Sequence, residues 1–94
     1  MIEILKFEMI SKGPLIAKFN VKMHKWGGLI IKGCSLFDSN GKKWVSMPSQ
    51  QYESEGKKKY FPYISYENKD IDQKFRDTIL LAVNEYLEKM KPIN

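Results

Sequence analysis

The sequence has almost none of the residues that form disulfides or zinc sites. Its 94 residues include one cysteine, Cys34, and one histidine, His24. A single cysteine excludes an internal disulfide, and no set of Cys and His residues has zinc-site spacing. A chain without disulfides is typical of a reducing compartment. We therefore expect a cytoplasmic protein that uses no metal or other cofactor.

Long apolar runs are also missing. No run approaches the roughly 20 apolar residues that a membrane span requires. The amino-terminal segment contains Glu3 and Glu8, whereas a signal peptide begins with basic residues. We expect neither export nor a membrane partner.

Catalytic motifs are absent as well. The sequence contains no Gly-rich phosphate loop, no GxSxG and no HExxH. His24 falls at the polar end of a predicted strand, and Cys34 is of a type that is usually a small core residue. Glu53 and Glu55 lie beside three lysines, where solvated ion pairing is the simplest interpretation. The sequence therefore predicts a protein that is not an enzyme and has no small-molecule substrate.

The length and composition are those of one folded domain. A chain of 94 residues buries roughly 60 to 65% of its unfolded surface, which is sufficient for one modest core. The apolar fraction of 43% and the charged fraction of 29% are ordinary for a globular protein, which argues against global disorder. We expect residues 1–94 to form a single domain.

Positive charge is in excess, and it is unevenly distributed. The formal net charge is +5. Residues 1–69 hold twelve lysines against six acids (12 − 6 = +6), and residues 70–94 hold four basic residues against five acids (4 − 5 = −1). A basic surface attracts phosphate backbones whatever their base sequence. The alternative is that the charge serves solubility alone.

The hairpin predicted over residues 36–49 organises the rest of the chain. Asn40-Gly41 tolerates the positive φ angles of a tight turn, and the second arm, residues 42–47, stops at Pro48, which has no amide hydrogen. Alternating residues predict a strand over 15–24 with its partner over 29–37, where Gly33 marks a bulge. A first strand over 2–10 has a bulge near Ile4. We expect a polar loop over 49–59 and an edge strand over 60–66, weakened by Pro62.

From Asn68 onward the apolar period changes from two to between three and four. Asp70 and Gln73 form a capping-box pattern, and the apolar stripe that follows predicts one long amphipathic helix that ends before Pro92. The predicted fold class is α+β, with an antiparallel sheet of hairpins, about four or five strands, packed against this C-terminal helix. Three leucines widen the stripe beyond what one sheet covers: Leu80, Leu81 and Leu87.

Lysines and aromatic residues alternate with each other in the first two thirds of the chain. Lysines meet phosphates, and aromatic rings stack on unpaired bases. If the hairpins lie side by side, these residues form one surface, to which Lys32 and Tyr60 would also contribute. The candidate nucleic-acid-binding residues are Lys57, Lys58, Lys59, Lys42, Lys43, Lys18, Lys22, Trp44 and Tyr52. The alternative is that the rings of Tyr60, Phe61 and Tyr63 belong to the core or to an interface.

Several motifs in chain order carry a family resemblance: Lys12-Gly13 before the alternating strand, Ile31-x6-Asp38-x2-Gly41-x3-Val45-x-Met47-Pro48-Ser49, Pro62 after a basic run, and Val83-Asn84-Glu85-Tyr86. With these motifs the chain resembles, from about residue 12 to residue 88, the SpoVG family, the stage V sporulation protein G or septation regulators of bacteria. The resemblance implies a sheet backed by a C-terminal helix and a homodimer joined through strands. It also implies DNA and RNA binding in a regulatory role without catalysis.

The resemblance fails at the two residues that follow Met-Pro-Ser. In the family, basic residues linked to nucleic-acid binding follow Met-Pro-Ser directly, whereas Gln50 and Gln51 stand here. Either the contact has moved along the loop to residues 57–59, or binding is weak or different. Two functions stay open: a homodimeric nucleic-acid-binding regulator, and a non-catalytic protein-interaction module on the same fold. Dimer formation is expected because the helix stripe is wide and short sheets must cover their edges.

Overall fold

Six strands and one helix make up the described residues, 2–90, of the computed structural model. In chain order they are β1 (Ile2–Lys12), β2 (Leu15–Met23), β3 (Leu29–Ser39), β4 (Lys42–Ser46), β5 (Ser49–Ser54), β6 (Lys57–Pro62) and α1 (Lys69–Lys89). The predicted fold class is confirmed: the protein is α+β, with an antiparallel four-stranded sheet and one C-terminal helix.

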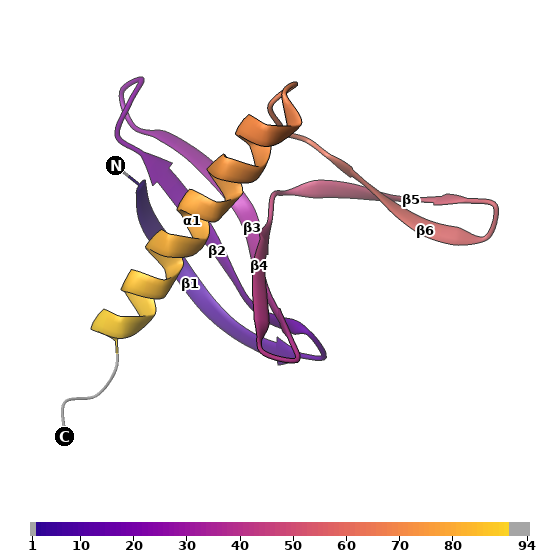
Figure 1. The fold of residues 1–94 in the computed structure, drawn as a ribbon, viewed down its shortest axis with the longest axis horizontal. Coiled ribbons are helices and arrows are strands. Elements are labelled where there is room, and N and C mark those ends of the chain that lie inside the picture. The colour runs from indigo at the N-terminus through magenta and orange to yellow at the C-terminus, as the bar shows by residue number, and fades with distance from the viewer. Residues whose placement is uncertain (1, 91–94) are drawn as a thin grey trace.

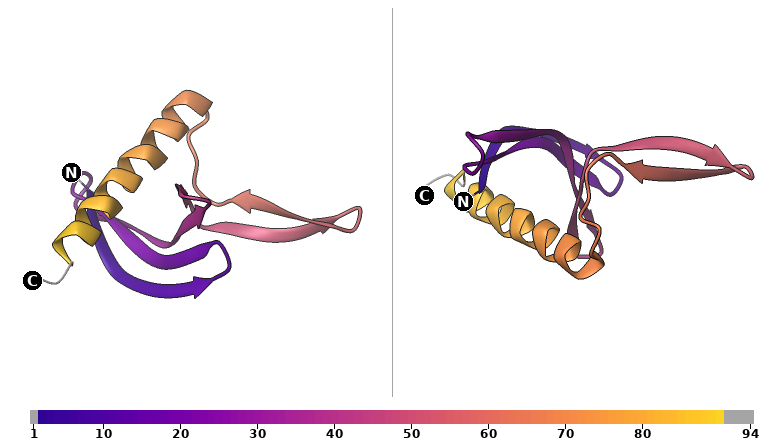
Figure 2. Two further views of the ribbon diagram at one scale, coloured as in Figure 1. Left: turned by 60° about the horizontal axis from the view of Figure 1, so that its bottom comes forward. Right: turned by 90° about the horizontal axis from the view of Figure 1, so that it is seen from above.

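The strands form two separate sheets (Figure 1). β1, β2, β3 and β4 pair in chain order, and α1 crosses one face of this sheet. β5 and β6 pair only with each other, and Figure 2 shows that they project away from both the sheet and the helix. We call β5, β6 and their turn the arm, residues 49–62, and we call the four-stranded sheet with α1 the body.

The arm contains a tight turn that was not predicted from the sequence. Asn40 and Gly41 join β3 to β4 with φ angles of 55° and 82°, as the Asn-Gly pair predicts. Glu55 and Gly56 join β5 to β6 in the same way, with φ angles of 54° and 76°. The predicted polar loop over 49–59 is therefore wrong. Neither face of the arm packs on the core, so its strands lack the apolar alternation that identifies a strand.

Two of the four register shifts in the four-stranded sheet bring side chains onto the face that packs on the helix. In β1 the register passes from Leu5 opposite Asn20 to Glu8 opposite Lys18, so that two residues of β1, Lys6 and Phe7, lie against one residue of β2, Phe19. This bulge is near the predicted position at Ile4, and it turns Phe7 toward α1. There the Phe7 ring packs against the rings of Phe19 and Tyr86, with centroids 6.1 and 5.1 Å away.

The second bulge confirms the expectation for Gly33. The register between β2 and β3 shifts around this residue, whose φ of +86° suits glycine because a side chain there would be strained. The amide of Gly33 donates a hydrogen bond of 3.2 Å to Oδ1 of Asn20. The bulge brings Cys34 and Leu36 onto the helix-facing side of β3, where both are fully buried.

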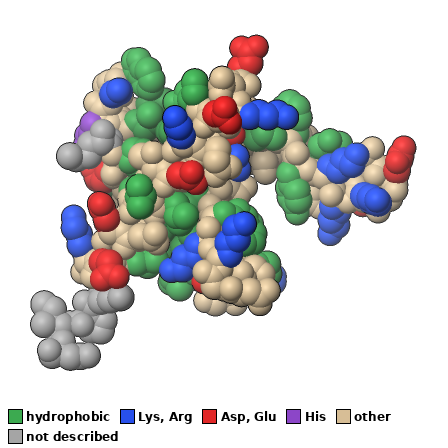
Figure 3. Space-filling model, viewed as in Figure 1, with side chains coloured by type: hydrophobic (Ala, Val, Ile, Leu, Met, Phe, Trp, Pro, Cys, Tyr) green, Lys and Arg blue, Asp and Glu red, His purple; other side chains and the backbone are tan. Residues whose placement is uncertain are grey.

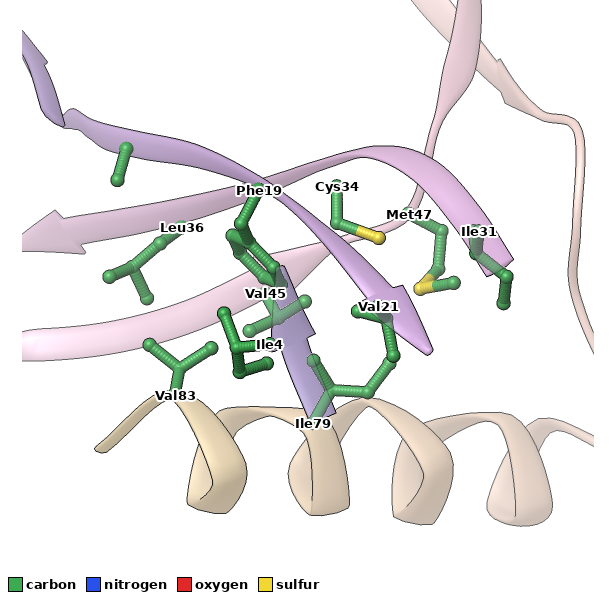
Figure 4. Packing of buried hydrophobic residues seen from close by; sticks show 11 residues of the cluster. Ile4, Phe19, Val21, Ile31, Cys34, Leu36, Val45, Met47, Ile79 and Val83 are labelled. Atoms are coloured by element: carbon green, nitrogen blue, oxygen red, sulfur yellow. The ribbon is translucent and has the colours of Figure 1, made fainter. Parts of the chain in front are cut away.

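The core is the single layer of apolar side chains between the sheet and α1 (Figure 4). Ile79 and Val83 point from α1 into this layer, and both are fully buried. Leu80 and Leu87 pack against this layer. The prediction that the sheet leaves them uncovered is therefore wrong for these two leucines. Leu81 is 64% exposed and remains outside.

The helix begins at Lys69, two residues earlier than a cap at Asp70 predicts, and its cap is a different residue. The side chain of Asn68 accepts hydrogen bonds from the amides of Asp70 and Ile71, at 2.9 and 3.1 Å, so the predicted cap at Asp70 is wrong. Gln73 instead donates to Asp77 within the helix. Asn and Asp cap helices about equally well, and here the chain leaves its extended conformation at Asn68. Pro92, the predicted stop, lies outside the described residues.

No helix within residues 2–90 combines the length and apolar character that crossing a bilayer requires.

The buried thiol of Cys34 provides a test of the core. Burial raises its pKa from 9.0 to about 11, because the charged thiolate loses its hydration. At pH 8 we expect an aromatic disulfide reagent to react with Cys34 only in denaturant. The unfolded chain releases the thiol proton at lower pH than the folded chain does, so stability should fall as pH rises from about 9 to about 11. Urea titrations at several pH values would show this fall, and it should be smaller in Cys34→Ala. Rapid labelling of the folded protein would contradict the buried placement.

Candidate nucleic-acid interface

The arm is a two-stranded ribbon that is accessible from both sides. All six residues of β6 are exposed, and the base of the arm is closed by a hydrogen bond of 2.9 Å from the amide of Tyr63 to the carbonyl of Pro48. The radius of gyration of 14.3 Å exceeds the roughly 12 Å expected of a compact chain of this length. The arm therefore extends well beyond the body, and its side chains are available to a ligand.

Cross-strand register divides the arm into two different faces. Lys59 lies opposite Tyr52, Lys57 opposite Ser54, and Phe61 opposite Gln50. Because side chains alternate along a strand, these residues share one face. We call it the lysine face, defined by Tyr52, Lys57, Lys59 and Phe61. Basic and hydrophobic side chains lie side by side along the arm (Figure 3).

The third arm lysine is in a different electrostatic position. Lys58 lies on the other face, directly opposite Glu53. Opposite charges at directly paired positions attract each other across two strands. Of the lysine run at 57–59, Lys57 and Lys59 therefore present positive charge without an opposing carboxylate, and Lys58 does not.

The lysines of the body are also paired with acids across strands. Lys18 lies opposite Glu8, and Lys22 opposite Glu3. Lys43 lies opposite Asp38. These carboxylates reduce the positive potential that the three lysines present. Lys42, opposite Ser39, has no acid at its paired position.

The seven predicted lysines, all within the described residues, therefore fall into three groups and do not form one continuous surface. One group is on the arm, one is at the turn between β3 and β4, and one is along β2. Lys22 and Lys42 lie near opposite ends of the sheet, because β2 ends where β3 begins and β4 begins where β3 ends (Figure 1).

Lys42 and Lys43 line a groove of about 480 Å³ between β4 and α1. Arg76 and Asp77 of α1 line the same groove. The guanidinium of Arg76 is already engaged within α1. Its Nη2 donates a hydrogen bond of 3.0 Å to Oε1 of Gln73. Its Nε lies 3.5 Å from Oδ2 of Asp72 as an ion pair, without a hydrogen bond. The two lysines thus supply the accessible positive charge of this groove, beside one carboxylate.

Trp44 lies on the face of the sheet that points away from α1. Its ring stacks on Phe37, with centroids 5.3 Å apart and planes 9° from parallel, and these residues are directly opposite in the register. Trp44 lines a depression of about 470 Å³ that Lys18 of the sheet and Tyr60 of the arm also line. The structure thus brings together Lys18, Trp44 and Tyr60, while Tyr52 lies on the arm with Lys57 and Lys59.

Sequence reasoning left two aromatic residues out of the candidate site, Phe37 and Phe61. A two-residue turn fixes the pairing of the strands that flank it. The turn at Asn40-Gly41 therefore pairs Phe37 with Trp44, which the sequence alone could have shown. The turn at Glu55-Gly56 pairs Phe61 with Gln50, but it was not recognised, because Glu rarely adopts a positive φ.

The described residues hold no group of three or more His, Cys, Asp and Glu that could ligate a metal ion. His24 lies at the edge of the sheet, where its Nε2 is 3.1 Å from Oε1 of Glu3. Cys34 is buried in the core. These two residues lie apart from the arm and from the depression beside Trp44.

Comparison with protein-family models, with curated proteins and with solved structures found no match to this chain.

Proposed function

We propose that the protein is a homodimeric regulator that binds DNA or RNA, without catalysis, chiefly through the lysine face of the arm. The observation that carries this proposal is the arm itself, which extends from the body with Lys57 and Lys59 beside Tyr52 and Phe61. Lysines attract phosphates, and exposed rings stack on bases. Phe61 is 64% exposed, so its ring is available to a base.

The shape of the arm fits a nucleic acid. Each strand has six residues, so the arm is about 20 Å long at roughly 3.3 Å per residue. The major groove of B-form DNA, about 12 Å wide, admits a two-stranded ribbon. A flexible single strand can also follow such a ribbon, with phosphates at the lysines and bases on the rings.

The proposed likeness to the SpoVG family fits the same part of the molecule. Gln50 and Gln51, where the family has basic residues, lie at the base of the arm opposite Phe61 and Tyr60. Lys59 is one paired position further toward the tip than Gln51, and Lys57 is three. At about 3.3 Å per residue, the positive charge is displaced along one ribbon by roughly 3 to 10 Å. This favours a relocated contact over a lost one.

A homodimer would protect surfaces that the monomer leaves open. An isolated two-stranded ribbon is only marginally stable in water, and its unpaired edges can pair with another chain. Leu81 and Ile71 on α1 are 64% and 50% exposed. A twofold interface would also present two arms to one nucleic acid.

The double variant Lys57→Ala/Lys59→Ala tests the proposed contact. If each lysine neutralises one phosphate, the slope of log affinity against log salt should fall by about 1.8 on duplex DNA or about 1.4 on a single strand. The measurement is a titration of labelled DNA and RNA at several salt concentrations.

Two single variants serve as matched controls. Lys58→Ala removes the same charge from the opposite face of the arm, next to Glu53, and should change the slope less than Lys57→Ala does. Lys25→Ala removes an exposed lysine from the turn after β2 and should have little effect. Affinity that is indifferent to salt, or equal losses in all variants, would refute the assignment to the lysine face.

A second function has its own supporting observation. Five large apolar side chains between residues 60 and 66 are 42% to 65% exposed: Tyr60, Phe61, Tyr63, Ile64 and Tyr66. Such an apolar segment also fits a protein partner. Pull-down from nuclease-treated extract separates the two functions, since a partner held through nucleic acid would be lost and a direct protein partner would stay.

A further inference from the structure

The depression beside Trp44 has the geometry of a stacking site. Trp44 is 39% exposed, and the ring of Phe37 lies parallel to it. Phe37 therefore supports the indole in a fixed orientation and leaves part of it open to the depression. Tyr60, 65% exposed, lines the same depression from the arm. Three aromatic residues, Phe37 and Trp44 of one sheet and Tyr60 of the other, thus line one space of about 470 Å³, within the roughly 300–1,000 Å³ typical of small-ligand sites.

The polar groups around these rings favour an anionic ligand. Lys18 is the one charged side chain that lines the depression, and the hydroxyls of Ser35 and Ser46 line it beside Lys18. The register places Lys18 opposite Ser35, and Ser35 opposite Ser46, across three adjacent strands. Glu8 lies opposite Lys18 on its other side, in β1. The carboxylate of Glu8 weakens the attraction of Lys18 for an anion, although Glu8 does not line the depression.

We infer that this depression binds one unpaired nucleobase, stacked on Trp44 beside Tyr60, with a neighbouring phosphate at Lys18. The inference rests on the proposed function and deepens it, since it names single-stranded nucleic acid as the preferred ligand. Bases within a duplex already stack on their neighbours and reach such a site only if they are unstacked, at a free-energy cost. The lysine face of the arm can contact either form, so the depression is what discriminates between them.

The fluorescence of Trp44 reports directly on the depression. The sequence has two tryptophans, and Trp26 is 75% exposed at the turn between β2 and β3. Trp26→Phe therefore leaves Trp44 as the one tryptophan, which is excited selectively over the tyrosines. Three probes of equal length are titrated: a thymidine oligonucleotide, an oligonucleotide whose sugars carry no bases, and a duplex. We expect the thymidine oligonucleotide to quench Trp44 and to bind about 5- to 100-fold more tightly than the abasic one. The duplex should bind without quenching.

Tyr60→Ala and Tyr63→Ala form a matched pair of variants. The two tyrosines are 65% and 64% exposed, but only Tyr60 lines the depression, and neither belongs to the core. Tyr60→Ala should weaken binding of the thymidine oligonucleotide several-fold and leave binding of the abasic one unchanged. Tyr63→Ala should leave this ratio unaltered. Glu8→Gln should strengthen binding of both probes, because it removes the carboxylate opposite Lys18.

The outcomes separate the two proposals. Equal binding of the thymidine and abasic oligonucleotides, with unchanged Trp44 fluorescence, would overturn the stacking site and leave the arm as an electrostatic contact. Failure of all three probes to bind would overturn both proposals. Trp44 emission that changes with protein concentration alone, and not with oligonucleotide, would assign the depression to a second copy of the chain and overturn the inference.

Discussion

Replacing the arm with a two-residue turn is expected to remove most of the proposed nucleic-acid affinity while the body stays folded. The change removes residues 49–62 and joins Pro48 to Tyr63 through Asn-Gly. The amide of Tyr63 and the carbonyl of Pro48 are 2.9 Å apart, so the two ends already lie at the separation that a tight turn requires. No residue of the arm belongs to the buried core.

The expected loss is large because the arm holds two kinds of contact. Removal of Lys57 and Lys59 should lower the salt slope by about 1.8 on duplex DNA. Removal of Tyr52 and Phe61 also removes two exposed rings, each of which contributes roughly 1–3 kcal/mol when a base stacks on it. Affinity for a single strand should therefore fall by at least about 25-fold. Fluorescence anisotropy with labelled oligonucleotides measures this loss, and circular dichroism monitors the fold.

The double variant Lys57→Ala/Lys59→Ala is the graded comparison, because it keeps the ribbon and its rings. Its affinity should lie between those of the intact protein and the armless protein. Undiminished binding by an armless protein that is folded would assign the contact to the lysines of the body, Lys42 and Lys43 first.

Ile79→Ala is expected to lower the free energy of unfolding by about 2–5 kcal/mol. Ile79 is fully buried and points from the middle of α1 into the side chains of the sheet (Figure 4). The single layer between sheet and helix is the whole core of the described residues, so little surrounding structure can collapse into the cavity. For a domain of this size the total stability is roughly 5–14 kcal/mol, and the variant should lose a large part of it. Urea titration followed by circular dichroism measures the change.

Leu81→Ala is the control for this experiment. It truncates an apolar side chain of similar size two residues along the same helix, where the side chain is 64% exposed. In a monomer its effect should stay within about 0.5 kcal/mol. A larger, concentration-dependent loss would instead place Leu81 in a dimer interface, and an Ile79→Ala variant as stable as the unmodified protein would contradict the packing of α1 on the sheet.

The body was predictable because its residues obey one simple rule. Ala17, Phe19 and Val21 alternate with polar residues along β2 and are buried as expected. Ile79 and Val83 belong to the predicted apolar stripe of α1 and are its two fully buried residues. Wherever one side of an element packs on a core, the period of the apolar residues identifies the element.

The arm was not predictable by the same rule. Gln50, Gln51 and Tyr52 are all exposed, as is every residue of β6, so no face of the ribbon selects apolar residues at a period of two. The helix cap was mispredicted for a similar reason, since the sequence pattern indicated Asp70 and the structure has Asn68. Both residues can cap a helix, and only the path of the chain before the helix determines which one does.

The amino-acid sequence by itself determined the α+β class, the hairpin at Asn40-Gly41 and the amphipathic helix, because each depends on neighbours in the chain and on one buried face. Tertiary structure alone decided which lysines lie together. Lys18 and Lys22 lie opposite carboxylates of β1, and Lys58 lies opposite Glu53. The pairing of β1 with β2 and of β5 with β6 sets these contacts. The pairing of β5 with β6 also leaves Lys57 and Lys59 together on one face of the arm. The sequence did not show these arrangements, because electrostatic interactions depend on distance in space.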